Sequence, residues 1–210
     1  MSGFLITLEG IDSCGKTTQA HLLEARLESE AVPHLLLREP GGTAVGEKIR
    51  HLLLQKEHPL TDNTEILLYA AARAELVVTV IRPALKKGLV VVCDRYLDST
   101  VAYQGYGSGG DGAWIRALNE RVTGGLRPQL TFLFDLSVEE AFRRRGGGGD
   151  RIEERDLSYH RRVRRGYLAI AGEEPARFNV IDATAPAEKQ HEAVWSKVEA
   201  ALQGRCSGEL

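Results

Sequence analysis

Eight residues near the N-terminus, at positions 10–17, restrict what this chain can fold into. They read Gly-Ile-Asp-Ser-Cys-Gly-Lys-Thr and fit the pattern G-x-x-x-x-G-K-[ST] at every fixed position. The apolar run Phe4–Glu9 before them predicts a strand, and the helical spacing of Ala20, Leu23 and Leu27 after them predicts an amphipathic helix. A glycine-rich turn between a strand and a helix is the context that a phosphate-binding loop requires.

The chemistry of such a loop assigns roles to its residues. Glycines let successive backbone N–H groups turn toward an anion at the start of a helix. Lys16 would contact the β- and γ-phosphates of a nucleotide, and the Thr17 hydroxyl would be a ligand of Mg²⁺. We expect Lys16 to face solvent while no nucleotide is bound. The predicted donor-nucleotide contacts here are Gly10, Ile11, Asp12, Ser13, Cys14, Gly15, Lys16, Thr17 and Thr18. The loop predicts a nucleoside triphosphate site without specifying the reaction.

Strand-like and helix-like segments alternate along the rest of the chain. The predicted strands are Phe4–Glu9, His34–Arg38, 89–93, 130–136 and Phe178–Asp182. Leu-Val-Val-Val at 89–92 is apolar on both faces, as in a strand that helices cover on both sides. This alternation predicts an α/β fold of the P-loop NTPase type, with three layers and a parallel five-stranded sheet flanked by helices. We expect one domain over residues 1–210.

Composition excludes several classes of partner. The chain has 210 residues and a net charge of −2, which argues against general binding to nucleic acids or to anionic membranes. It has no apolar run of about 18 residues and no signal-peptide pattern at its N-terminus. An odd number of cysteines, three, makes a complete disulfide framework unexpected. We therefore expect a cytoplasmic protein that binds neither nucleic acid nor membrane.

Charged residues follow several predicted strands. Arg38 and Arg95 would lie at the carboxyl edge of a parallel sheet, where ligands of such folds bind, and Arg73 lies in a helical segment. A solvated surface role is the alternative for each arginine. Asp94 ends an apolar strand, which is the usual place of a carboxylate that holds Mg²⁺. Asp135 has the same local pattern, but the neighbouring Arg95 favours Asp94, and a helix cap is the alternative for Asp135.

The reaction can be narrowed by what else a nucleotide-binding chain contains. A GTPase-type switch would have an N/TKxD segment to read the base, and this sequence has none. A kinase would need a second anion site for an acceptor phosphate, and the strand-end arginines could supply it.

Seven blocks, in this order and spacing, resemble the bacterial thymidylate kinases over about residues 4–184. They are LEGIDSCGKTT at 8–18, REPGGT at 38–43, LLYAAAR at 67–73, DRYLDSTVAYQG at 94–105, RPQLTFLFDL at 127–136, DRIE at 150–153 and IDAT at 181–184. The resemblance implies transfer of the ATP γ-phosphoryl group to dTMP with Mg²⁺, in a homodimer. Another nucleoside monophosphate kinase or a deoxynucleoside kinase is the second hypothesis, and an ATP-binding regulatory switch is the third.

The resemblance also implies how dTMP is held. Tyr69 stands where the family usually has a phenylalanine that stacks on thymine, and Gln104 would hydrogen-bond the base. Tyr103 would lie against C2′ of the sugar, Asp12 would reach the 3′-hydroxyl or a metal-bound water, and Thr100 falls in the same substrate-binding block. From residue type alone, Tyr69 could equally be a half-buried aromatic residue of a core helix, and Tyr103 and Gln104 an ordinary loop.

Other implied roles concern phosphates and adenine. Arg38, Arg73 and Arg95 would bind the acceptor phosphate, with Arg73 also at the edge of the base. The backbone of Asp182, Ala183 and Thr184 would pass beside the adenine of ATP.

An arginine-rich segment at about 143–156 predicts a lid. It combines Arg143, Arg144, Arg145 and Arg151 with four consecutive glycines at 146–149, and mobile charge of this kind suits closure over phosphates. The alternative is a solvated helix face, which fits residues 161–165 better. Residues 11–14 of the phosphate loop contain no Arg or Lys, a pattern in which bacterial relatives supply the missing cation from the lid. The predicted catalytic residues are Lys16, Asp94, Arg95, Arg151 and Arg145.

Two further points stay open at this stage. Cys14 lies near a helix N-terminus, a position that favours a reactive thiol, but a small side chain turned inward would be unreactive. The apolar segment 76–81 fits either a dimer interface or the internal core.

Overall fold

Five parallel strands form the centre of the molecule. The computed structural model describes residues 3–57 and 59–207, with the side chains of residues 205–207 left out. The strands are β1 (Phe4–Glu9), β2 (His34–Arg38), β3 (Val90–Asp94), β4 (Leu130–Asp135) and β5 (Phe178–Asp182). Their order in the sheet is β2-β3-β1-β4-β5, and every neighbouring pair is parallel. The predicted parallel five-stranded sheet is confirmed. Strand β3 begins and ends one residue later than the predicted 89–93, and β4 ends at Asp135, one residue before the predicted end at 136.

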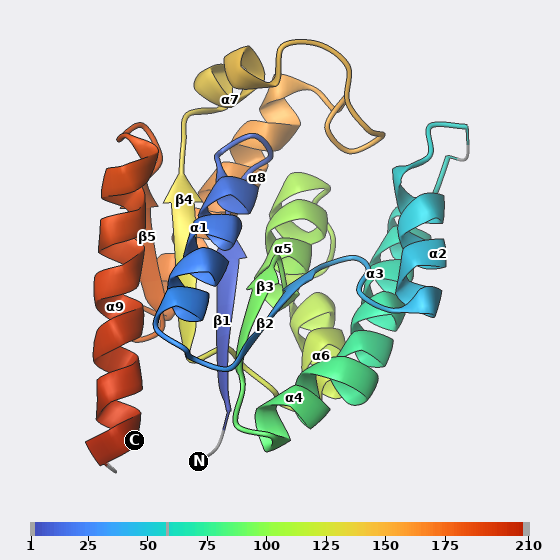
Figure 1. Ribbon diagram of the computed structural model, residues 1–210. Coiled ribbons are helices and arrows are strands. Elements are labelled where there is room, and N and C mark those ends of the chain that lie inside the picture. The colour runs from blue at the N-terminus through green and yellow to red at the C-terminus, as the bar shows by residue number, and fades with distance from the viewer. Residues whose placement is uncertain (1–2, 58, 208–210) are drawn as a thin grey trace.

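Helices cover both faces of this sheet (Figure 1). On one face lie α1 (Lys16–Ser29) and α9 (Ala187–Ser207), which pack on each other, and on the opposite face lies α8 (Leu157–Glu173). The other helical segments are α2 (Ala44–Leu54), α3 (Asp62–Leu76), α4 (Arg82–Lys86), α5 (Leu97–Thr100), α6 (Gly112–Thr123) and α7 (Val138–Arg145), with two π-helical segments, η1 (Val77–Ile81) and η2 (Val101–Gly107). The three layers are those expected from the sequence.

Alternation along β1 shows why the sheet needs both helical layers. Ile6 and Leu8 are buried in one large apolar cluster that includes Leu23 and Leu27 of α1. Leu5, which points the other way, is buried in a second cluster. All six residues of β1 are buried, which is the pattern of a central strand covered on both sides.

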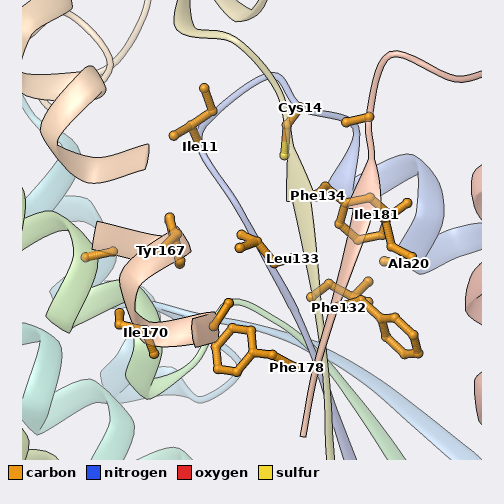
Figure 2. Packing of buried hydrophobic residues seen from close by; sticks show 14 of the residues in the cluster. Ile11, Cys14, Ala20, Phe132, Leu133, Phe134, Tyr167, Ile170, Phe178 and Ile181 are labelled. Atoms are coloured by element: carbon orange, nitrogen blue, oxygen red, sulfur yellow. The ribbon is translucent and has the colours of Figure 1, made fainter. Parts of the chain in front are cut away.

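Strands β4 and β5 show the same arrangement in Figure 2. Tyr167 and Ile170 approach the sheet from α8, and Ala20 lies on the opposite side, on α1. Phe132 and Phe134 of β4 point toward the α1 side, whereas Leu133 points toward Tyr167. Each strand therefore fills both halves of the core with large apolar side chains.

The apolar segment 76–81 lies mainly in the core. Leu76, Val77 and Ile81 are fully buried in the cluster that contains Leu5, whereas Val78 is exposed. None of the described helices combines the length and apolar character that a membrane-spanning helix needs.

A buried ion pair ties the sheet to the helices around it. Arg177 donates from Nη1 and Nη2 to the two carboxylate oxygens of Asp98, at 2.8 Å each, and its Nη1 also donates to Thr131 on β4. Asp98 is almost fully buried, and Glu174 is the second carboxylate at this guanidinium. Removing one member of such a pair leaves a buried charge with too few partners.

We predict that Asp98→Ala lowers the free energy of unfolding by about 3 kcal/mol, because the guanidinium of Arg177 stays buried. The matched control is Glu173→Ala, which removes an ion pair of 2.7 Å between half-exposed side chains, Glu173 and Arg116. The control should change stability by less than about 1 kcal/mol, since exposed pairs contribute little. Urea unfolding of the three proteins measures both values, and equal losses would contradict the prediction.

Candidate active site

The phosphate loop forms between β1 and α1 as the sequence predicts. Its backbone has positive φ angles at Gly10 (141°), Ser13 (61°) and Gly15 (101°). A Cβ atom on Gly10 would lie 2.6 Å from the backbone oxygen of Phe134, so that no larger residue fits there without movement of β4. The loop can therefore turn this tightly only with glycine at position 10.

The N-terminus of α1 has no side-chain cap. Gly15 precedes the helix and offers no acceptor, whereas α2, α3, α6, α7 and α8 each begin with a Thr, Asp or Ser oxygen that accepts a backbone N–H. The first N–H groups of a helix need an acceptor from outside it. At α1 that acceptor can be an anion, which the positive end of the helix dipole also favours.

Lys16 does not face solvent, and this expectation was wrong. Its side chain is buried, and Nζ donates to the backbone oxygens of Gly10 at 3.0 Å and Ile11 at 2.8 Å. The ammonium group lies inside the curve of the loop because those two carbonyl groups are the acceptors that the loop itself supplies. Cys14 is fully buried beside it, with Sγ 3.6 Å from Nζ, which favours the unreactive alternative for this thiol.

Of the two candidate carboxylates for a metal, Asp94 lies next to the phosphate loop. The hydroxyl of Thr17 donates to Oδ2 of Asp94 at 2.9 Å. Asp135 instead receives a forked pair of hydrogen bonds from Arg164, at 2.7 and 2.8 Å. A hydroxyl and a carboxylate are oxygen donors of the kind that Mg²⁺ takes together with phosphate oxygens and water. No group of three or more His, Cys, Asp or Glu residues in the described ranges forms a metal cluster of its own.

Arg95 follows Asp94 and connects the loop to the acceptor side of the site. It has a positive φ of 71°, which is uncommon for a residue with a side chain. Its guanidinium group pairs with Asp12 and donates to the oxygen of Gly10 at 3.0 Å and the hydroxyl of Tyr103 at 3.1 Å. The carbon Cζ also lies 4.9 Å from the centre of the Tyr103 ring. These contacts fix the guanidinium at the mouth of the phosphate loop.

The buried carboxylate of Glu9 and the partly exposed carboxylate of Asp12 have pKa values shifted in opposite directions. Burial alone would raise the pKa of Asp12, but the charges of Arg95 and Lys16 and the hydrogen bond from Tyr103 lower it to about 2. Burial raises the pKa of Glu9 to about 7, with a further increase from the charge of Asp98, against hydrogen bonds from Ser99 and Tyr167. Asp12 is therefore a permanent negative charge at neutral pH.

One cavity of about 1010 Å³ joins the loop to the predicted acceptor residues. Its walls include Asp12, Ser13, Gly15, Lys16, Thr17, Thr18, Arg38, Tyr69, Arg73, Asp94, Arg95, Thr100, Tyr103 and Gln104. All eight substrate-binding residues predicted from the sequence are among them. The side-chain oxygens of Thr100 and Glu39 (Oε1) are buried and lack a hydrogen-bond partner within the described part of the chain. Buried polar atoms in native proteins are nearly always paired, so these two are candidate contacts for a ligand.

Arg73 is the most deeply held arginine of the cavity. Its side chain is 1% exposed, and it donates to Glu39 at 2.8 Å, to Asn119 at 2.7 Å and to the backbone oxygen of Tyr96 at 3.0 Å. Arg38 is the opposite case, because it is exposed and pairs with Glu47 at 3.2 Å. The two arginines therefore differ in how freely they can follow a ligand.

The lid segment begins within α7 and continues as a loop to Asp156, which caps α8. Arg145 donates to the backbone oxygen of Glu153, and Arg151 pairs with Glu65 at 2.5 Å. Neither arginine is in the cavity wall in this conformation. Arg144 is in the wall, where it donates to the backbone oxygen of Ala183 at 3.0 Å.

The segment after β5 approaches the same region. The N–H of Ala183 donates to the backbone oxygen of Asp135, and Asp182 accepts from both the N–H and the hydroxyl of Thr184. Gln19 of α1 donates to the backbone oxygen of Ala187 at 2.8 Å. Residues 182–184 thus form an ordered turn near α1, although they are not part of the described cavity wall.

The charged residues of the cavity wall that sequence reasoning did not assign to a binding role include Glu39 and Arg50, and Arg144, which was placed in the lid, also lies in the wall. Arg50 had a detectable signal, because it lies on the same helical face as Gly46 and Leu53, the two buried residues of α2. A charged residue on a buried face needs a partner or a ligand. For Glu39, the only signal in the sequence was its position next to Arg38.

Comparison with known proteins identifies the family. The family model described as thymidylate kinase matches residues 8–194. A thymidylate kinase of Thermomicrobium roseum is 49% identical over 99% of this chain and 100% of its own length. A thymidylate kinase of Caldanaerobacter subterraneus is 46% identical over 97% of this chain and 99% of its own length. The crystal structure of thymidylate kinase from Ehrlichia chaffeensis has a TM-score of 0.80 at 37% identity and covers 95% of this chain and 100% of that one. The chain belongs to the thymidylate kinase family.

Proposed function

We propose that this protein transfers the γ-phosphoryl group of ATP to dTMP, which gives ADP and dTDP. The observation that carries the proposal is the shared cavity, with Lys16 and Thr17 on one side and Arg38, Tyr69 and Gln104 on the other. Phosphoryl transfer depends mainly on positioning two nucleotides and neutralising charge between them. A single cavity with an anion-binding helix end and a second set of arginines meets both requirements.

On the donor side, the uncapped start of α1 and Lys16 would hold the ATP phosphates. Lys16 would exchange the backbone oxygens of Gly10 and Ile11 for phosphate oxygens. Thr17 and Asp94 would hold Mg²⁺, which neutralises phosphate charge when bound. The turn at Asp182, Ala183 and Thr184 would pass its backbone beside the adenine.

On the acceptor side, Arg38, Arg73 and Arg95 would bind the phosphate of dTMP, and Tyr69 would stack on the base. Asp12 would accept from the 3′-hydroxyl, since its low pKa keeps it an acceptor. The ring of Tyr103 would lie against C2′. It is held in place by its hydroxyl, which donates to Asp12 at 2.7 Å and accepts from Arg95.

The lid would supply further cations during transfer. Arg151 and Arg145 would each have to leave a partner, Glu65 or Glu153, to reach the phosphoryl group. Arg144 already lines the cavity. We retain Arg151 and Arg145 as the proposed transition-state arginines, with Lys16, Asp94 and Arg95 as the fixed part of the catalytic machinery.

We further propose a cytoplasmic homodimer built from one domain over residues 1–210. The support is a set of exposed apolar side chains on neighbouring segments, Val45 and Leu52 on α2, Leu67 on α3 and Val78 on η1. Helices α2 and α3 lie together at one side of the molecule (Figure 1). A second copy of the chain would remove these side chains from water.

The proposed reaction predicts that ADP release with MgATP requires dTMP. Another monophosphate kinase would respond to another nucleotide, and a regulatory switch would release ADP slowly whether or not dTMP is present. In Lys16→Ala, dTMP-dependent release should fall more than about tenfold, because a β/γ-phosphate contact is lost. Since Lys16 is buried, the unfolding midpoint of the variant must be measured beside its kcat. A folded variant with more than a tenth of the activity would contradict the role of the loop.

Tyr103 predicts discrimination against ribose. The protein should use dTMP far better than its ribose counterpart, because the ring occupies the space of a 2′-hydroxyl, and Tyr103→Ala should narrow the gap. The control Tyr103→Phe keeps the ring but loses the hydrogen bonds to Asp12 and Arg95, so it should lower activity while keeping the preference. The ratio of kcat/KM for the two substrates tests this, and equal values in the unmodified protein would remove the steric argument.

The lid arginines should act on kcat more than on KM for dTMP, because they contact the phosphoryl group only in the transition state. Arg151→Ala, Arg145→Ala and the double variant should lose activity in that pattern, with compensation between the two. Arg143→Ala is the matched control, since Arg143 is 78% exposed and, among the described residues, forms an ion pair with Glu140 alone. Unchanged kcat in all three variants would assign these arginines to solvated surface charge.

A further inference from the structure

Glu65 of α3 is a buried carboxylate that the mechanism described above uses only as the resting partner of Arg151. Its side chain is 1% exposed, and its two oxygens have different partners. Oε1 accepts from Nε2 of Gln104 at 2.7 Å. Oε2 accepts from Nη2 of Arg151 at 2.5 Å, and Arg155 lies 3.7 Å from the same oxygen. Glu65 therefore joins a residue of the cavity wall to the lid.

The contact with Glu65 fixes which way the Gln104 amide faces. A carboxylate only accepts hydrogen bonds, whereas an amide has an N–H₂ donor and a carbonyl acceptor on opposite branches. Only Nε2 of Gln104 can therefore point at Glu65. Gln104 is buried and lines the cavity, so its Oε1 atom and its second N–H are what it can offer a base.

This orientation matches one pyrimidine and opposes another. Thymine has an N3–H donor beside an O4 acceptor, and cytosine has an N3 acceptor beside a 4-amino donor. An amide that presents Oε1 to position 3 and N–H to position 4 complements thymine, and the same amide turned over complements cytosine. The orientation of the Gln104 amide therefore decides whether its hydrogen-bonding groups complement thymine or cytosine.

We infer that Glu65 sets the preference for thymine over cytosine by holding the amide of Gln104 in one orientation. This inference rests on the proposed function, in which Gln104 contacts the base. Glu65 acts through Gln104 and is a positioning residue. The free energy needed to hold the amide comes from a buried hydrogen bond to a charged acceptor, which is stronger than one between neutral groups.

The contact with Arg151 determines how the Gln104 amide would be oriented in a Glu65→Gln variant. In Glu65→Gln the new amide has one oxygen and one N–H₂ group to share between Arg151 and Gln104. Arginine only donates, so the oxygen turns to Arg151 and the N–H₂ group turns to Gln104. Gln104 must then accept with Oε1 and present its Nε2 group to the base. The substitution therefore turns the second amide over without changing the volume of the side chain.

The test is the binding of dTMP and dCMP by calorimetry in the full chain without ATP, a condition in which Arg151 has no transferring phosphoryl group to leave residue 65 for. In Glu65→Gln the Kd of dTMP should rise and the Kd of dCMP should fall, so that their ratio changes by at least about tenfold. Damage to the fold or to the lid would weaken both nucleotides and leave the ratio unchanged. Opposite shifts of the two constants are therefore specific to the amide.

Two controls complete the experiment. Glu75→Gln makes the same change on the same helix, at a carboxylate without a hydrogen bond or ion pair to any described residue, and should leave the ratio unchanged. In a Gln104→Leu background, Glu65→Gln should no longer alter the ratio, because the amide is gone. An unchanged ratio in Glu65→Gln, or an equal change in the Gln104→Leu background, overturns the inference. If the unmodified protein fails to phosphorylate dTMP, the proposed function fails instead.

Discussion

Parallel pairing of the five strands is the constraint on which the site depends. A parallel sheet brings the carboxyl end of every strand to one edge, so residues far apart in the chain become neighbours. In the register, Arg38 of β2 is opposite Asp94 of β3, and Asp94 is opposite Leu8 of β1, two residues before the phosphate loop. The contact between Thr17 and Asp94, 77 positions apart in sequence, follows from this register.

Around that edge, several buried or partly buried charges are already paired. Arg73 is held by Glu39, Arg95 by Asp12, and Arg151 by Glu65. Burying ion pairs is seldom a net gain in stability, because desolvation offsets the attraction. For Arg73 and Arg95, which line the cavity, such pairs supply orientation, since each guanidinium is held in place without a ligand. Preorganised charge of this kind is a principal source of rate enhancement in enzymes.

The fold was predictable because its signals are local. Each strand of the sheet is an apolar run, and the phosphate loop has fixed spacing between strand and helix. Strand ends moved by one residue because Asp94 still pairs in the sheet although its side chain is charged. Asp94, and not Asp135, lies beside the phosphate loop, and the signal that favoured it was the neighbour Arg95, because both residues share the strand pattern. Its role as a metal ligand stays a prediction.

Side-chain partners across the site were not predictable in the same way. The sequence gives no local signal that Glu65 will meet Gln104, 39 positions later, or that Arg151 will lie against the same carboxylate, 86 positions later. The prediction that Lys16 faces solvent was wrong for a related reason. The loop pattern states which residue binds phosphate, but the acceptors used without a ligand are carbonyl groups whose directions depend on the φ angles of the loop.

These internal partners change how nucleotide binding should be understood. Lys16, Arg95 and Arg151 all donate to oxygens of the chain, so under the proposed function a phosphate would have to displace those oxygens. For Lys16 the exchange replaces neutral carbonyl oxygens by charged phosphate oxygens, and charge-assisted hydrogen bonds are the stronger. For Arg151 the acceptor that is given up, Glu65, is itself charged. The cations are already removed from water when the protein folds. The free energy of phosphate binding at each cation therefore depends on the difference between its hydrogen bonds to the protein acceptor and to the phosphate. The displacement of Arg151 from Glu65 affects the lid and Gln104 differently. A phosphate that takes Arg151 from Glu65 leaves that carboxylate with Gln104 and Arg155, so the lid can move while Gln104 keeps its hydrogen bond.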